Sequence, residues 1–113
     1  MTNPGWSKSF PDSIVVCDLS GIIIEMNERA AEMYKAYGGK ELVGKNLLEC
    51  HPEPARSKMK TLLETGNRNI YTIEKNGIRK MIYQAPWYQD GQRLGMLELA
   101  FEIPSDMPHF IRE

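Results

Sequence analysis

The sequence predicts an α+β domain, in which a five-stranded antiparallel sheet carries short helices on one of its faces. Three observations lead to this fold class. A hairpin rich in isoleucine and valine at residues 13–24 runs directly into a helix, several short helical segments follow up to Thr65, and from Asn69 onward the apolar residues alternate with period two. Because the strands before and after the helices need a common core, we expect them to join one sheet with the helices on one face.

The first hairpin consists of two short apolar runs on either side of a turn that contains Asp18 and Gly21. An aspartate in a turn can bond its own backbone, and glycine tolerates a positive φ. Asn27 follows as a predicted helix N-cap, because its side-chain oxygen can accept a backbone N–H of the first helical turn. Gly38 is then expected to end this helix.

The middle of the chain predicts single helical turns over 40–50, interrupted by Pro52 and Pro54, and a longer helix over 53–65 that ends at Gly66. Three strands follow at 69–74, 78–85 and 94–103. Their predicted turns are Asn76–Gly77 and Asp90–Gly91, which are dipeptides that favour tight hairpins.

Length and composition indicate one ordinary globular domain. The chain has 113 residues, of which 42% are hydrophobic and 26% charged, and its net charge is −1. We divide it into an N-terminal leader (1–11), a domain (12–103) and a C-terminal tail (104–113). The charge balance argues against a nucleic-acid or membrane-surface partner, and no apolar run approaches the roughly 20 residues of a membrane span. The leader lacks an apolar signal core, so we expect a cytoplasmic protein in which Cys17 and Cys50 stay reduced.

Several local motifs, in their order along the chain, resemble those of PAS domains. They are Asp18, Gly21, Ile23 (or Ile24), Asn27 and Ala30 around the first hairpin; Leu42, Val43, Gly44 and Lys45 after the first helix; and Asp90, Gly91 and Gly95 in the last hairpin. The resemblance covers about residues 12–103. It implies a sensory or protein-interaction module that is often dimeric and usually belongs to bacterial signalling, such as a two-component system. It does not imply a particular ligand.

Residues 46–59 resemble more specifically the haem-binding PAS domains of oxygen-sensing rhizobial kinases, which carry a similar Pro-Glu-Pro-x-Arg-Ser run. In that family an iron-ligating histidine follows the run, whereas this chain has Met59 at that position. His51 lies upstream and could ligate haem iron, with Met59 or Cys50 as a second soft ligand. We prefer the simpler interpretation, in which Met59 belongs to the core and His51 to a loop. The cofactor is therefore left unknown, and no other metal site is expected, since the cysteines and histidines lack zinc spacing.

If a small ligand binds, we expect it between segment 46–63 and the concave face of the sheet, because short helices interrupted by proline pack less completely than one long helix. The expected pocket residues are His51, Met59 and Leu63 from the helical segment, and Tyr71, Tyr83 and Leu99 from the sheet.

The last two strands carry apolar residues on both faces, which predicts that the outer face of the sheet is covered. The cover is either the chain's own terminal aromatic residues or a second subunit, and we favour a homodimer. The expected residues of this dimer face are Trp6, Phe10, Met96 and Ala100.

No arrangement of nucleophile, base or phosphate-binding glycines indicates an enzyme. We therefore expect a non-enzymatic signalling module that binds a small ligand or a protein partner and relays the change to a dimer partner or an effector domain. The alternatives are a dimerisation or scaffold domain with a fully packed core, and a haem-based gas or redox sensor.

Overall fold

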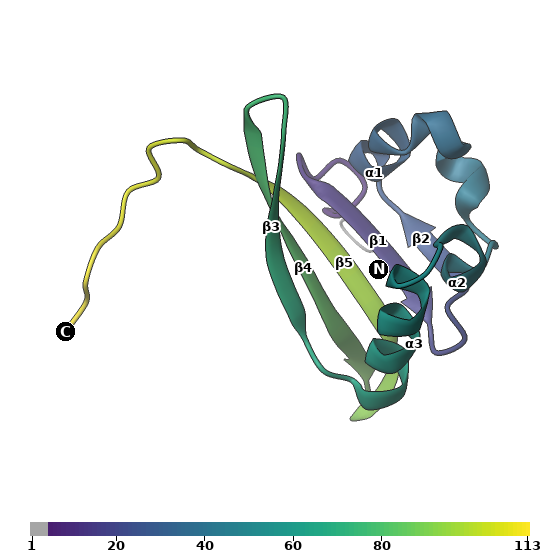
Figure 1. Ribbon diagram of the computed structural model, residues 1–113. Helices are drawn as coiled ribbons and strands as arrows, with labels where there is room; N and C mark the ends of the chain where they lie inside the picture. Colours follow the sequence, from purple (N-terminus) through teal and green to yellow (C-terminus); the bar gives the residue numbers. More distant parts are fainter. Residues whose placement is uncertain (1–4) are drawn as a thin grey trace.

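A single antiparallel sheet with the strand order β2-β1-β5-β4-β3 forms the scaffold of the protein, as seen in a computed structural model that describes residues 5–113 (Figure 1). The strands are β1 (Ser13–Asp18), β2 (Ile23–Met26), β3 (Asn69–Lys75), β4 (Ile78–Gln89) and β5 (Gln92–Ile103). The helices are α1 (Glu28–Met33), α2 (Leu47–Cys50) and α3 (Ala55–Thr65), with 3-10 turns η1 (Lys35–Tyr37) and η2 (Gly39–Leu42) between α1 and α2. The predicted fold class is confirmed.

The hairpin turns have the backbone conformation that their sequences predict. Asn76 and Gly77 have φ values of 54° and 77°, and Asp90 and Gly91 have values of 52° and 79°. Left-handed conformations at both central residues match the twist of the flanking strands. The β4–β5 hairpin is longer than expected, because pairing continues to Gln89 and Gln92 beyond a bulge after Trp87.

Asn27 is the predicted N-cap of α1, and its buried side chain also fixes the start of β1. Its Oδ1 accepts hydrogen bonds from the backbone N–H groups of Ala30 at 2.9 Å and Ile14 at 3.0 Å. Its Nδ2 donates to the carbonyl of Asp12 at 2.8 Å. One amide therefore holds the N-terminal entry, the first strand and the first helix together.

Arg93 of β5, which the sequence pattern did not single out, ties the C-terminal end of α3 to the sheet. Gly66 ends the helix with a left-handed φ of 73°, and its N–H donates to the carbonyl of Leu62. The guanidinium of Arg93 on β5 donates to the carbonyls of Leu63 at 2.9 Å and Glu64 at 3.1 Å. These bonds satisfy carbonyls that the end of a helix leaves without partners.

Strand register decides which side chains face the helices. Met96 of β5 packs in one core cluster with Met59, Leu62 and Leu63 of α3, so the even-numbered residues of β5 point to the inner face. Ala100 lies on that face too, and both Met96 and Ala100 are only 4% exposed. The assignment of Met96 and Ala100 to an outer dimer face is therefore wrong. Side chains alternate along a strand, so choosing the wrong face as the inner one misplaces every residue of that strand.

The outer face carries the opposite set of side chains. Tyr83 pairs with Leu99, and Leu99 pairs in turn with Ile14 of β1, so these three residues form a row across the outer face. The prediction that Tyr83 and Leu99 line the pocket required both side chains to face the helices. They face the opposite side of the sheet.

Trp87 covers one end of this outer face. It stands opposite Gly95 in the β4–β5 pair, and its indole N–H donates to the carbonyl of Cys17 at 2.9 Å. A Cβ at Gly95 would clash with the carbonyl oxygen of Cys17 and would lie 2.7 Å from the indole nitrogen, so only glycine leaves room for this contact.

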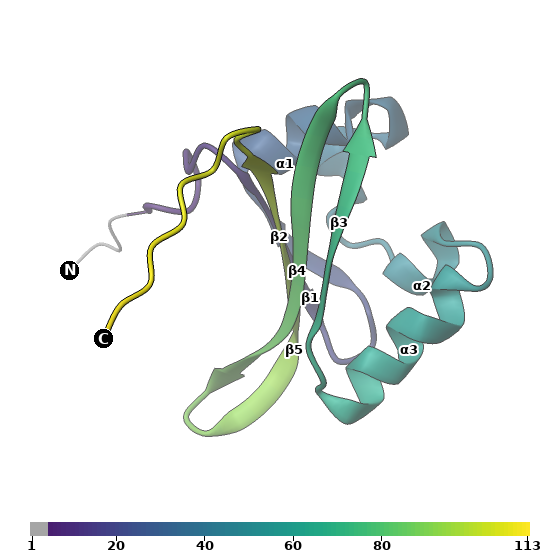
Figure 2. The ribbon, with the colours of Figure 1, turned by 60° about the vertical axis from the view of Figure 1, so that its left-hand side comes forward.

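The described part of the N-terminal segment and the C-terminal tail both lie on the side of the sheet away from α2 and α3 (Figure 2). The rings of Trp6 and Phe10 meet edge to face at 5.9 Å, while Trp6 remains 66% exposed. In the tail, Phe110 and Ile111 are 69% and 86% exposed, so they do not cover the sheet. Residues 1–4 of the predicted leader lie outside the described residues. Within residues 5–113, no helix is long and apolar enough to cross a membrane.

Candidate ligand-binding site

A cavity of about 650 Å³ lies between the inner face of the sheet and the helical segment. It separates two clusters of core residues. One cluster joins Cys17 and Met96 of the sheet to α3, and the other joins Val15 and β2 to Ala30 of α1. Leu47 of α2 packs against both clusters. The volume falls within the range of about 300–1,000 Å³ that is usual for small-molecule sites.

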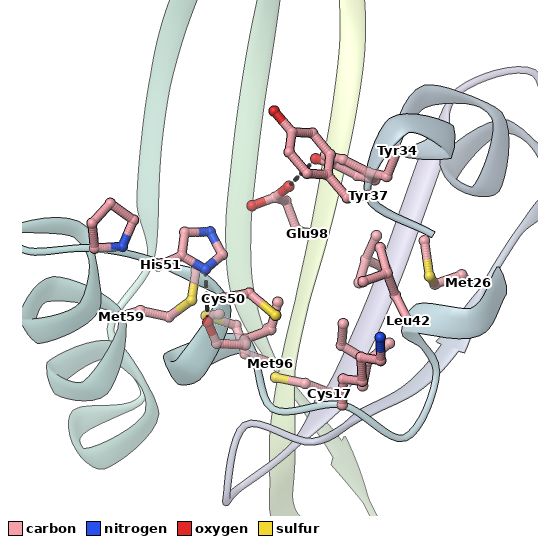
Figure 3. Close-up of a pocket in the computed structure, with 15 residues that line it drawn as sticks. Cys17, Met26, Tyr34, Tyr37, Leu42, Cys50, His51, Met59, Met96 and Glu98 are labelled. Atoms are coloured by element: carbon pink, nitrogen blue, oxygen red, sulfur yellow. Dashed lines mark hydrogen bonds between the residues drawn. The ribbon is translucent and has the colours of Figure 1, made fainter. Parts of the chain in front are cut away.

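The cavity wall is mostly apolar and rich in sulfur (Figure 3). Five of its fifteen lining residues carry sulfur, namely Cys17, Met26, Cys50, Met59 and Met96. Methionine thioethers are flexible and polarisable, so such a wall adapts to apolar ligands of irregular shape and favours contact with aromatic rings. Exposed residues of the wall, among them Tyr37 and Lys45, lie where the cavity opens to solvent.

Four polar side chains form a hydrogen-bonded row across the inner face. Asn69 Nδ2 donates to Gln84 Oε1 at 2.7 Å, and Gln84 Nε2 donates to Glu98 Oε2 at 2.8 Å. The hydroxyl of Tyr34 donates to Glu98 Oε1 at 3.2 Å, which links the end of α1 to β5. Figure 3 shows the Glu98 carboxylate between the two tyrosines Tyr34 and Tyr37 on one side and His51 on the other.

His51 lies at the end of α2, half-buried in the cavity wall. Its Nδ1 lies 2.7 Å from the carbonyl oxygen of Leu47. A carbonyl oxygen only accepts hydrogen bonds, so Nδ1 carries the proton and Nε2 of the neutral ring has a free lone pair. The imidazole can therefore accept a hydrogen bond or ligate a metal through Nε2.

Burial and the charge of Glu98 set the acidity of several groups around the cavity. Burial raises the pKa of the Cys17 thiol to about 11; a backbone hydrogen bond with Met96 opposes this shift, and the charges of Asp18 and Glu98 add to it. Burial also raises the pKa of Tyr34, and the negative charge of Glu98 raises it further. The cavity thus favours neutral thiol and phenol groups beside one carboxylate.

A second, smaller cavity of about 360 Å³ adjoins the first along the sheet toward β3. The two cavities share four lining residues, which are Tyr34, His51, Met59 and Glu98. Tyr71 of β3 lines the second cavity.

The structure brings together only part of the predicted pocket. His51 and Met59 line both cavities, and Tyr71 lines the smaller one, whereas Leu63 is a core residue that packs beside Met59. Tyr83 and Leu99 lie on the opposite face of the sheet.

Sequence reasoning missed Glu98 and Tyr34, two of the four residues that line both cavities. A signal was available for Glu98. It lies between apolar residues on β5 and opposite Gln84 on β4, and two polar residues paired in the middle of a sheet indicate a polar site on that face.

The described residues, 5–113, contain no group of three or more histidine, cysteine, aspartate or glutamate side chains that could hold a metal ion.

Comparison with known proteins gives the family. The PAS domain family profile matches residues 11–85, which is more than half of the chain. The chain belongs to the PAS domain family. None of the curated proteins compared with it matches the chain.

Solved structures share the fold at low sequence identity. The PAS domain of an HTR-like protein from Haloarcula marismortui superposes with a TM-score of 0.61 at 19% identity, covering 87% of this chain and 86% of that one. A sensory box sensor histidine kinase from Vibrio cholerae gives 0.62 at 15% identity, covering 83% and 82%. The Aer2 receptor from Vibrio cholerae, described as a dual PAS-haem oxygen sensor, gives 0.59 at 19% identity, covering 82% and 95%.

Proposed function

We propose that this PAS domain is a sensor that binds a small organic molecule in the cavity between sheet and helices and relays its occupancy through β5. The observation that carries the proposal is the cavity of about 650 Å³ inside an otherwise formed core. A domain that served only as a scaffold would gain stability by filling such a space with side chains, since the lining of a void loses packing contacts.

The geometry also supports a route for the signal. Glu98 lines the cavity, and its neighbours Leu97 and Leu99 on the same strand point to the outer face. Tyr34 and Gln84 hold the Glu98 carboxylate from α1 and β4. A ligand that changes these hydrogen bonds would shift β5 from one arrangement to another, and the outer face of the strand would shift with it. The ligand drives this change only if it binds the two arrangements of β5 with different affinity.

Thermal unfolding with a collection of small metabolites tests the proposal. A compound at one hundred times its Kd stabilises the folded state by about 2.7 kcal/mol, which is on the order of ten degrees in Tm for a domain of this size. We expect such compounds for the wild type and for Val43→Phe, which changes an exposed loop residue. Val15 is a buried residue of the cavity wall, so Val15→Phe places a larger side chain in the cavity and should abolish the stabilisation by these compounds. Equal responses of Val15→Phe and the wild type would contradict the proposal, as would no response at all.

A haem sensor is the second candidate, and the orientation of His51 is the observation that favours it. The free Nε2 of its ring belongs to a cavity wall that also offers the thioether of Met59, and imidazole and thioether are both known haem-iron ligands. The donor set therefore fits haem, which would supply reversible gas binding or electron transfer. His51 would hold the iron, and the apolar wall would exclude water from it.

The haem candidate is tested by adding haemin to the purified protein and recording the absorbance spectrum. A histidine-ligated spectrum in the wild type that disappears in His51→Ala is the expected result. A haem complex that survives in His51→Ala, or no complex in the wild type, would remove this candidate.

We further propose that the outer face of the sheet is the surface that a second copy or another signalling protein reads. Half-buried apolar side chains cover β4 and β5 on this face, including Met81, Tyr83, Leu97, Leu99 and Phe101. Trp6 and Phe10 belong to the N-terminal segment, which lies on the same side of the sheet (Figure 2). A patch of adjacent, partly exposed apolar residues of this kind is typical of an interaction surface.

A further inference from the structure

The junction of the two cavities carries the charge of Glu98, which no other side chain of residues 5–113 neutralises through an ion pair. Glu98 lines both cavities and is only half-buried, so its carboxylate is accessible from them. Its two hydrogen-bond donors, Tyr34 and Gln84, are neutral. Within residues 5–113 the ion pairs are Arg29–Glu32 and Arg79–Glu74, and neither involves Glu98.

The carboxylate is held in place as a binding group would be. Gln84 is 4% exposed, and its amide is fixed on its other side by Asn69. A carboxylate offers about four acceptor sites, and the described side chains use one on each oxygen. The remaining sites leave room for a ligand that donates hydrogen bonds. The two lysines among the lining residues, Lys45 and Lys58, are both exposed and make no ion pair with Glu98.

Aromatic rings surround this charge on both sides. Tyr34 lines both cavities, Tyr37 lines the larger one and Tyr71 lines the smaller one. The face of an aromatic ring attracts cations. Phenols are neutral at pH 7, and burial and the charge of Glu98 raise the pKa of Tyr34 and Tyr71 further, so the negative charge among these three side chains belongs to Glu98.

We propose that the ligand is an organic cation, a protonated amine on an apolar and preferably aromatic body. Its ammonium group donates hydrogen bonds to Glu98 at the junction of the cavities, and its body lies against the sulfur-rich wall formed by Met59, Met96 and Cys17. This inference rests on the proposed ligand-binding function and names the chemical class of the ligand. The wall supplies apolar contact without a second fixed charge, and the carboxylate supplies the selectivity for a cation.

Isothermal titration calorimetry at pH 7 with three compounds of similar shape tests the charge preference directly. The probes are phenethylammonium, the neutral 2-phenylethanol and the anionic 3-phenylpropionate. A hydrogen bond to a charged group contributes enough to make the ammonium bind about tenfold or more tightly than the alcohol. The carboxylate should bind more weakly than the alcohol.

Two glutamate variants assign the preference to its residue. Glu98→Gln keeps the size and the acceptor oxygen but removes the charge, and it should reduce the preference for the ammonium to less than about threefold. Glu102→Gln is the matched control, because Glu102 lies on the same strand and face but is exposed and lines neither cavity. It should keep the full preference. The comparison of the three probes on the wild type stands even if Glu98→Gln fails to fold.

The outcomes separate this inference from the proposed function. Binding of the alcohol or the carboxylate at least as tight as that of the ammonium overturns the cation while leaving the cavity as a ligand site. A preference that survives in Glu98→Gln also overturns the assignment. If the ammonium does not bind, the inference fails, and if the metabolite collection also gives no response, the proposed function fails with it.

Discussion

The hydroxyl of Tyr34 and the carboxylate of Glu98 are joined by a hydrogen bond of 3.2 Å across 64 positions of sequence. This bond connects the end of α1 to the central part of β5 at the edge of the cavity. Because the two residues come from different layers of the fold, any ligand that competes for Glu98 loosens a contact between the helices and the sheet.

Removing the Tyr34 hydroxyl tests this connection. Tyr34→Phe should lower the free energy of unfolding by about 0.5–1.5 kcal/mol, since Glu98 loses one of its two donors. The exposed Tyr37, of which 75% is accessible, is the matched control, and Tyr37→Phe should leave stability within about 0.5 kcal/mol. Urea denaturation measures both. Equal stability of Tyr34→Phe and the wild type would show that this bond contributes nothing.

The Asn27 cap predicts a larger effect on stability. Asn27→Ala removes an N-cap and leaves the buried N–H groups of Ala30 and Ile14 without their acceptor, so we expect a loss of about 2 kcal/mol or more. Asn46 caps α2 through one bond to the N–H of Leu48 and is less buried, so Asn46→Ala should cost about 1 kcal/mol or less. Chemical denaturation of the two variants compares them. A smaller loss in Asn27→Ala than in Asn46→Ala would contradict the account of the buried amide.

The Cys17 thiol predicts a loss of stability at alkaline pH. Burial raises its pKa from the ordinary value of 9.0 to about 11 in the folded protein, so above pH 9 the unfolded state releases its proton first. The stabilising contribution is therefore complete below pH 9 and is lost as the pH rises to 11, by about 1–3 kcal/mol. Tyr34 and Tyr71, whose pKa values are also raised, act in the same direction.

Comparison with Cys17→Ala isolates the thiol from the tyrosines. Its free energy of unfolding should fall less steeply between pH 9 and 11 than that of the wild type, although it is lower at neutral pH because the core loses packing. Parallel pH curves for the two proteins would show that Cys17 does not contribute.

The outer face predicts self-association that a single charge disrupts. Leu99 stands between Ile14 and Tyr83 on this face, so Leu99→Glu should weaken a dimer at least about tenfold by burying a carboxylate in an apolar contact. Val43→Glu introduces the same charge in an exposed loop and should leave the dimer unchanged. Sedimentation equilibrium measures both. A wild type that stays monomeric would end the dimer proposal, and a dimer indifferent to Leu99→Glu would place the interface elsewhere.

Local chemistry made most of the fold predictable. The Asn76–Gly77 turn, the Asn27 cap and the Gly66 helix end each depend on a few neighbouring residues, and the structure confirms all three. The facing of the strands depends on the whole sheet. β5 carries apolar residues on both faces, so alternation alone could not decide whether Met96 or Leu97 points inward.

The site was harder to predict than the fold for the same reason. His51 and Met59 were identified because they lie on the helical segment, whose position over the sheet followed from the fold. Glu98 and Tyr34 meet only after folding, and neither belongs to a local motif. The polar pair of Gln84 and Glu98 was the available signal, but it required the register of β4 against β5.

Backbone amide chemical shifts, measured by NMR on the wild type with and without a stabilising compound, test the central claim most directly. The account predicts that the changes concentrate at the cavity, at Cys17, Tyr34, Met96 and Glu98, and continue to Leu97 and Leu99 on the outer face of β5. The turn at Asn76 and Gly77, which lies outside both cavities, should be unaffected. Changes confined to that turn or to the chain termini, with none at Glu98, would contradict a ligand site in this cavity.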